Sequence, residues 1–140
     1  MELKIIFRGT NVHVEMDDEL EKFLEYGFVD RAVRNGMEQA AEAVKVEINE
    51  NFNSGGRPGW EAKTDGSPAT LQQTGRLRFA ATDGAEVSIS DDEVEVATDP
   101  SVEYAGTVNY KRPFMVVPEG QPMENVAEAF LNGVVETIKE

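Results

Sequence analysis

The longest regular pattern in the chain is an apolar stripe with helical spacing across residues 28–51. Hydrophobic side chains recur at steps of three and four, which predicts an amphipathic helix of about 36 Å at ~1.5 Å per residue. Gly36 lies inside the stripe at a cost of about 1 kcal/mol relative to alanine. We therefore expect another helix to cross closely at Gly36. The stripe consists of Val29, Val33, Met37, Ala40, Val44, Ile48 and Phe52.

Residues 2–8 alternate between apolar and polar side chains, which is typical of a half-buried strand. A turn at Thr10-Asn11 would reverse the chain, and Val12 and Val14 would then extend the pairing. The sequence therefore predicts an antiparallel strand pair in this region.

Residues 85–98 have the pattern of a β-hairpin. With Asp91-Asp92 as a two-residue turn, Ser88 faces Glu95 on one side of the hairpin, and the branched apolar side chains share the other side. Turn length and alternation agree on this register, which is how a register is specified. The apolar pairs are Val87 with Val96 and Ile89 with Val94.

Shorter patterns predict the elements that complete the fold. They are a short helix that ends near Gly27, a helix over residues 76–81 with Thr74 as its N-cap, a helical turn over 101–106, an extended apolar run over 113–117 that predicts a strand, and a helix over 122–138. Met123, Val126, Ala127, Phe130, Val134 and Ile138 would form the buried stripe of the last helix.

A loop over residues 53–73 separates the long helix from the short one. Its first part, residues 53–70, is rich in Gly and Pro and holds the only Trp of the chain, a composition that builds no regular element. Loops longer than about 12–15 residues in compact domains are usually functional or disordered. We expect this loop to be ordered. Two roles are open for Trp60: an anchor at an interface, or packing against the chain's own core.

The order of these elements predicts an α+β fold in a single domain over residues 1–140. A small, mostly antiparallel sheet with a β-hairpin would pack against the long helix of the N-terminal half and the C-terminal helix. The loop would be the largest irregular segment.

The chain is strongly acidic, with 27 Asp and Glu against 13 Lys and Arg and a net charge of −14. Because phosphate neutralisation supplies most duplex affinity, this balance argues against sequence-independent nucleic-acid binding. Residues 83–103 carry acids and no base, which indicates either a solvated face or a surface that docks to a basic partner or lines a DNA channel. No apolar run approaches the ~20 residues of a membrane span, and we expect synthesis in the cytoplasm.

Few side chains here can perform chemistry. The absence of cysteine excludes disulfides, thiolate nucleophiles and Cys-ligated metals. His13, the only histidine, has no evident carboxylate constellation in the sequence, so we interpret it as structural or exposed. Asp91, Asp92, Glu93 and Glu95 lack the spacing of a calcium loop and indicate a solvated hairpin tip. We therefore expect no catalytic residue, no cofactor and no metal.

Five short blocks occur in a specific order and spacing between residues 57 and 116. They are Trp60, LQQTGRLR (71–78), EVEVATD (93–99), VEYAG (102–106) and KRPFM (111–115). This set resembles the phage virion-morphogenesis family of Mu-like phages, which includes tail-completion proteins. The chain departs from the family pattern at Ala97 and at residues 107–110, where the family has a His-Gln-x-Gly segment.

The resemblance implies a structural protein of the phage neck or tail end, not an enzyme, located in the virion and assembled in the host cytoplasm. Such proteins form rings, most often hexameric, and contact the tail tube, tail terminator or head-connector proteins. An acidic lumen would repel phosphate and let DNA pass without specific binding. No membrane partner is expected.

The interface residues that we expect lie within these blocks. The packing and interface anchors would be Trp60, Leu71, Leu77 and Phe114. The residues that shape the loop-to-helix turn would be Thr74 and Gly75. The cations that pair with acids of an adjacent subunit would be Arg76, Arg78, Lys111 and Arg112, and Tyr104 completes the set.

Two other classes of function remain open. An acidic mimic of DNA, or a similar binding module, would inhibit a nucleic-acid-binding protein, which a net charge of −14 suits. A small hydrolase or metal-dependent nuclease would need acids that converge in a pocket, whereas the densest acidic cluster lies along one hairpin.

Overall fold

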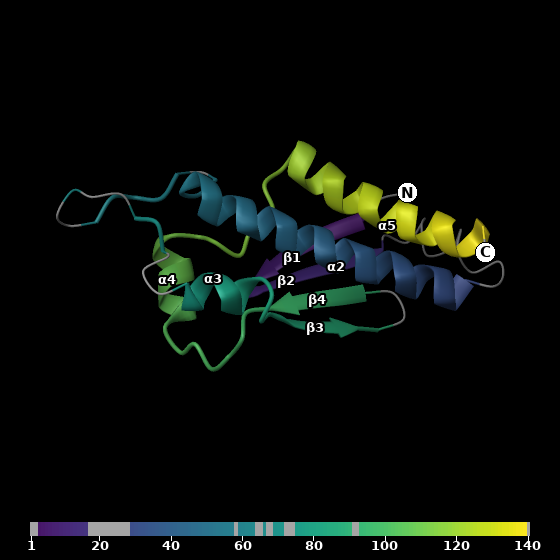
Figure 1. Ribbon diagram of the computed structural model, residues 1–140, viewed down its shortest axis with the longest axis horizontal. Helices are drawn as coiled ribbons and strands as arrows, with labels where there is room; N and C mark the ends of the chain where they lie inside the picture. Colours follow the sequence, from purple (N-terminus) through teal and green to yellow (C-terminus); the bar gives the residue numbers. More distant parts are fainter. Residues whose placement is uncertain are drawn as a thin grey trace.

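A sheet of four antiparallel strands forms one layer of the molecule, and two long helices lie over one of its faces (Figure 1). The computed structural model describes residues 3–16, 29–57, 59–63, 66, 69–71, 75–90 and 93–139. The elements are β1 (Leu3–Arg8), β2 (Asn11–Met16), α2 (Val29–Ser54), α3 (Arg76–Ala81), β3 (Glu86–Ile89), β4 (Glu93–Ala97), α4 (Ala105–Lys111) and α5 (Gln121–Lys139). The predicted α+β class is confirmed. The short helix expected to end near Gly27 lies outside the described residues.

The sheet has the order β1-β2-β4-β3, and every neighbouring pair is antiparallel. The register predicted for the hairpin is confirmed, because Ser88 pairs with Glu95 and Ile89 with Val94. The first turn differs by one residue from the expectation. Gly9 adopts a φ of +57°, which glycine tolerates best, and Asn11 is already the first residue of β2.

Apolar and polar side chains alternate along the strands, so one face of the sheet is apolar and the other is polar. Val12 and Val14 of β2 and Val94 and Val96 of β4 are fully buried in the core cluster that includes the described stripe of α2 from Val33 to Phe52. Their sequence neighbours therefore project to the opposite side. We call that side the outer face; its residues on β2, β4 and β3 are Asn11, His13, Glu15, Glu93, Glu95, Glu86 and Ser88.

The two long helices cross where glycines remove the side chains between them. A Cβ on Gly36 would lie 2.8 Å from the ring of Phe130, and one on Gly133 would lie 2.8 Å from the Cα of Gly36. Asn35 crosses the contact and donates to the Gly133 carbonyl at 2.8 Å. The close crossing expected at Gly36 is confirmed. Val126, Phe130 and Val134 of α5 are buried as predicted.

Two boundary or burial predictions are wrong. Helix α4 covers Ala105–Lys111 and not 101–106, because the chain first makes turns in which the Val102 amide donates to Asp99 and the Ala105 amide donates to Val102. Pro113 then ends α4, because its ring disfavours helical backbone at the preceding residue, Arg112. Ile138, which was predicted to lie in the buried stripe of the last helix, is 52% exposed.

Residues 113–117 form no strand, although their buried apolar side chains resemble one. Pro113 has no N–H to give to a ladder. Asn109 Oδ1 accepts the amides of Phe114 and Met115, at 3.0 and 3.1 Å. Asn51 Nδ2 donates to the carbonyls of Phe114 and Val116, at 2.7 and 2.8 Å. Side chains thus satisfy the backbone groups that a neighbouring strand would otherwise bind.

Candidate functional site

Motif residues that are about 50 positions apart meet at the C-terminal end of α2. The Trp60 ring packs edge-on against Phe52, with 5.6 Å between centroids, and Phe52 packs against Phe114 at 5.7 Å. The indole N–H of Trp60 donates to the carbonyl of Pro113 at 2.8 Å. Of the two roles left open for Trp60, packing against the chain's own core is therefore observed. We call Phe52, Trp60, Arg78, Arg112 and Phe114 the arm junction.

The arm junction holds the base of a projecting segment. The described residues of the segment 55–71, which we call the arm, leave the end of α2 and extend beyond the body of the fold (Figure 1). Arg112 binds the arm near its base through two hydrogen bonds. Its Nε donates to the Glu61 carbonyl at 2.9 Å, and its Nη2 donates to the Ala62 carbonyl at 3.3 Å. The outer part of the arm includes Gly66, which is exposed.

The arginines of the motif already bind oxygens within the chain. Arg78 donates to Asn49 Oδ1 at 3.0 Å and to Asn53 Oδ1 at 2.7 Å, with its guanidinium 5.9 Å from the centroid of the Phe52 ring. Arg76 donates to the Ser101 carbonyl at 3.1 Å. These contacts hold Arg78 at the arm junction and Arg76 beside Ser101, whereas the sequence suggested pairing with acids of an adjacent subunit.

The remaining expected interface residues divide into buried and exposed groups. Leu77 and Phe114 are buried, so of their two expected roles the structure shows packing. Leu71 packs against the core at a φ of +57°. Gly75, at +73°, is the N-cap of α3. Thr74, expected as that N-cap, lies outside the described residues.

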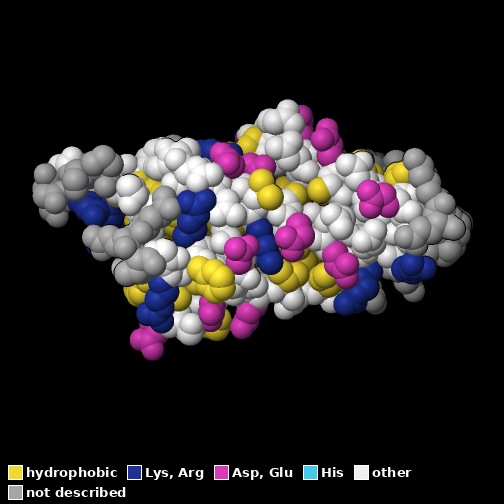
Figure 2. Space-filling model, in the orientation of Figure 1, with side chains coloured by type: hydrophobic (Ala, Val, Ile, Leu, Met, Phe, Trp, Pro, Cys, Tyr) yellow, Lys and Arg dark blue, Asp and Glu magenta, His cyan; other side chains and the backbone are white. Residues whose placement is uncertain are grey.

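Exposed aromatic side chains lie at the same end as the arm. Tyr110 is 89% exposed, Phe79 59% and Tyr104 45%. Phe79 lies on α3, Tyr104 directly precedes α4, and Tyr110 lies within α4 beside the exposed Lys111. Figure 2 shows hydrophobic and basic side chains intermixed at this end of the visible face. We call Phe79, Tyr104 and Tyr110 the aromatic patch; sequence reasoning identified only Tyr104 among its members.

Sequence reasoning also missed Arg57, which binds the C-terminal end of α2. Arg57 folds back and donates to Asn51 Oδ1 at 2.8 Å, to the Glu47 carbonyl at 2.6 Å and to Glu47 Oε1 at 3.1 Å. A cation at a helix C-terminus binds otherwise unsatisfied carbonyls and complements the helix dipole. A basic residue just beyond the end of a predicted helix is the signal that could have identified Arg57.

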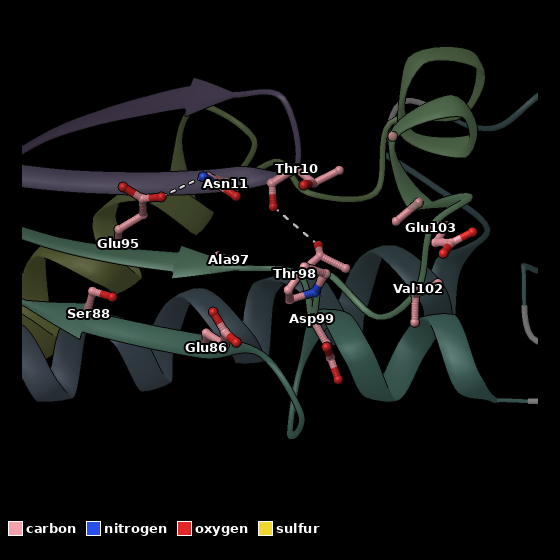
Figure 3. A pocket seen from close by; sticks show the side chains of 13 residues that line it. Thr10, Asn11, Glu86, Ser88, Glu95, Ala97, Thr98, Asp99, Val102 and Glu103 are labelled. Atoms are coloured by element: carbon pink, nitrogen blue, oxygen red, sulfur yellow. Dashed lines mark hydrogen bonds between the residues drawn. The ribbon is translucent and has the colours of Figure 1, made fainter.

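An acidic groove of about 460 Å³ runs along the end of the outer face, between the β4 terminus and the start of α4 (Figure 3). Glu86, Glu95, Asp99 and Glu103 supply its carboxylates, and none of its described lining residues is Lys or Arg. The backbone amide of Ser101 donates to Asp99 Oδ1 at 2.9 Å, and this bond holds the pKa of Asp99 below its ordinary value of 3.8. The groove suits a cationic group.

His13 is buried, as a structural histidine would be, but the expectation that no carboxylates surround it is wrong. Its Nε2 lies 2.9 Å from Glu93 and 3.4 Å from Glu15, and its Nδ1 lies 3.7 Å from Glu95. The cluster arises because β2 pairs with β4, which places residues about 80 positions apart on adjacent strands. Glu93 and Glu95 thus belong to a convergent cluster and not only to a solvated hairpin tip.

No family model, curated protein or solved structure matches the chain. Among the described helices, none combines the length and the apolar character needed to cross a membrane.

Proposed function

We propose that the chain is a structural subunit of phage virion assembly that acts at the neck or tail end by forming a ring with copies of itself. The observation that carries this proposal is the arm, a projecting segment whose base is fixed by Trp60 and Arg112. Both residues belong to the motif blocks that resemble the virion-morphogenesis family. A segment that projects from a fixed base can reach a neighbouring subunit. Long loops in compact domains are usually functional or disordered, and contact with a neighbour would give this loop a function.

The aromatic patch supports the same proposal. Three large rings are exposed at the arm end of the molecule, and Tyr110 is 89% exposed. Aromatic side chains dominate the energetics of protein interfaces because each buries a large area at low entropic cost. In a ring, the arm of one subunit would cover the aromatic patch of the next, and the tail tube, terminator or connector would bind the assembled ring.

The charge of the chain fits the passage of DNA through such a ring. With a net charge of −14, a lumen formed by this protein would repel phosphate. DNA would therefore slide through without specific binding.

The mass of the protein in solution, measured by light scattering with and without purified tail tubes, tests the proposal. We expect a ring-sized species, alone or on addition of tubes. Tyr110→Ala should weaken association at least tenfold, since an interface hot spot contributes about 2 kcal/mol. Leu131→Ala is the matched control, because Leu131 is an exposed apolar residue of α5. Equal behaviour of the two variants would contradict the assignment of the aromatic patch.

The acidic groove favours a second candidate function, a module that binds a basic protein in place of DNA. Its four carboxylates without an accompanying base among the described lining residues carry this alternative. It predicts a monomer that ignores tail tubes and captures a basic nucleic-acid-binding protein in a salt-sensitive way. The Glu86→Gln, Glu103→Gln double variant should then weaken capture, and the protein should remain a monomer.

A further inference from the structure

Three side chains on the outer face converge on one point. His13 and Glu15 alternate with the buried valines of β2, and Glu93 lies directly opposite Glu15 on β4. One nitrogen and two carboxylate oxygens from these residues all lie within 4.8 Å of one another. From this geometry we propose that His13 Nε2, Glu15 and Glu93 bind a divalent transition-metal ion such as Zn²⁺. This inference does not depend on the proposed function.

The separations of the donor atoms match those of ligands around one ion. Two ligands about 2.05 Å from a metal lie about 2.9 Å apart at a right angle and about 3.4 Å apart at the tetrahedral angle. His13 Nε2 is 2.9 Å from Glu93 Oε2 and 3.4 Å from Glu15 Oε2. The two separations from His13 therefore already suit one ion, and the two glutamate oxygens lie within 4.8 Å of each other.

The other nitrogen of His13 is an independent sign that a ligand completes the site. Only 6% of the His13 side chain is exposed, and its buried Nδ1 has no hydrogen-bond partner among the described residues. Glu95 Oε2 is the nearest carboxylate oxygen, at 3.7 Å. A metal on Nε2 would fix the proton on Nδ1, which would then point toward Glu95. Metal-bound histidines usually donate their second N–H to a carboxylate or carbonyl in this way.

Glu95 is held in place for this role by its own partner. Asn11 Nδ2 donates to Glu95 Oε1, which leaves Oε2 on the side of His13. Glu95 is therefore a positioning residue that acts through His13.

The charges at the site also favour a cation. Glu15 and Glu93 are direct cross-strand partners, and like charges in that position destabilise a sheet. A divalent ion between them would cancel both charges. Imidazole selects for zinc and similar transition metals over magnesium and calcium, which prefer oxygen ligands. The side chains of Glu15 and Glu93 are 29% and 42% exposed, so water can reach the ion and fill its remaining positions.

Calorimetric titration of the full-length, tag-free and chelator-treated protein with Zn²⁺ tests the site. We expect one saturable ion per chain and binding at least tenfold tighter than that of Ca²⁺. Glu93→Gln should weaken Zn²⁺ binding more than 100-fold, beyond the ~10–100-fold effect typical of outer-sphere partners. Glu86→Gln is the matched control, an exposed glutamate on the same face, and should leave the affinity unchanged. With Co²⁺ as probe, the visible absorption of a nitrogen-and-oxygen site should appear and should disappear in His13→Gln.

Unsaturable binding, equal affinity for Zn²⁺ and Ca²⁺, or equal losses in Glu86→Gln and Glu93→Gln would each overturn the proposal, because they indicate a diffuse acidic surface. If His13→Gln does not fold, Glu15→Gln and Glu93→Gln decide the matter, since both replace partly exposed side chains.

Discussion

The two ends of α2 are held by different physical means. Near its N-terminal end, Gly36 and Gly133 let two backbones touch, and the contact depends on the absence of side chains. At its C-terminal end, Phe52, Trp60 and Phe114 fill space with rings, and Asn51 binds irregular backbone. The first arrangement joins two regular helices, whereas the second fixes segments that have no regular structure. The comparison indicates that one end of α2 holds the two long helices together, whereas the other end holds the base of the arm.

The largest effect should come from filling the helix crossing. Gly36→Leu would drive its side chain into the Phe130 ring and carbonyl, each 2.8 Å from an added Cβ. Overpacking of this kind costs about 3 kcal/mol, and we expect that loss in chemical denaturation. Gly106→Ala is the control, because an added Cβ there meets nothing within 4 Å; it should stabilise α4 by up to about 1 kcal/mol. A Gly36→Leu protein of unchanged stability would show that the crossing is not close in solution.

Removal of the Asn51 side chain should be the next largest effect. Asn51→Ala leaves the buried carbonyl of Phe114 without its amide donor and removes the acceptor of Arg57 Nε. Buried unsatisfied groups cost about 1–3 kcal/mol each, so we expect a loss of about 2–3 kcal/mol in the free energy of unfolding. Asn132→Ala is the control, since Asn132 is an exposed asparagine on α5. Equal losses in the two variants would contradict the special role of Asn51.

Two substitutions at Trp60 separate its packing from its hydrogen bond. Trp60→Ala removes the ring from Phe52 and the N–H from the Pro113 carbonyl, and should cost about 2 kcal/mol because Trp60 is only partly buried. Trp60→Phe keeps an aromatic ring and should cost about 1 kcal/mol, the value of one hydrogen bond. Thermal unfolding measures both. If neither variant loses stability, Trp60 does not anchor the arm.

The smallest effect concerns Asp99 in the acidic groove. Its pKa is lowered by the hydrogen bond from the Ser101 amide, so the ionised carboxylate favours the folded state. This contribution is present above the unfolded-state pKa and is lost as the pH falls through the lower folded-state pKa. We expect NMR titration to place the pKa of Asp99 below 3.8. A value at or above 3.8 would show that the hydrogen bond is not formed in solution.

Sequence reasoning predicted those parts of the fold that local periodicity determines. The stripe of α2, the helix α3 and the register of Ser88 with Glu95 follow from neighbours within one element. Residues 113–117 were misassigned because a buried apolar run has the same composition whether a strand or an asparagine side chain binds its backbone. Asn51 lies about 60 residues away, and local sequence does not show that contact.

For the candidate sites too, local sequence patterns were predictive, whereas contacts between distant segments were missed. The motif blocks led to Trp60 and Arg112, which the fold does bring together. The cluster around His13 was missed because the sequence predicts which residues alternate along a strand but not which strands are adjacent. Once β2 is known to pair with β4, Glu93 and Glu95 necessarily lie beside His13.

Hydrogen–deuterium exchange of the free and the assembled protein tests the central claim most directly. The account predicts that peptides from the arm and from α4, including Tyr110, exchange more slowly in the assembled state. Peptides from the helix crossing at Gly36 should exchange equally in both states. Failure to assemble with or without tail tubes, or protection confined to the acidic groove with an unchanged arm, would contradict it.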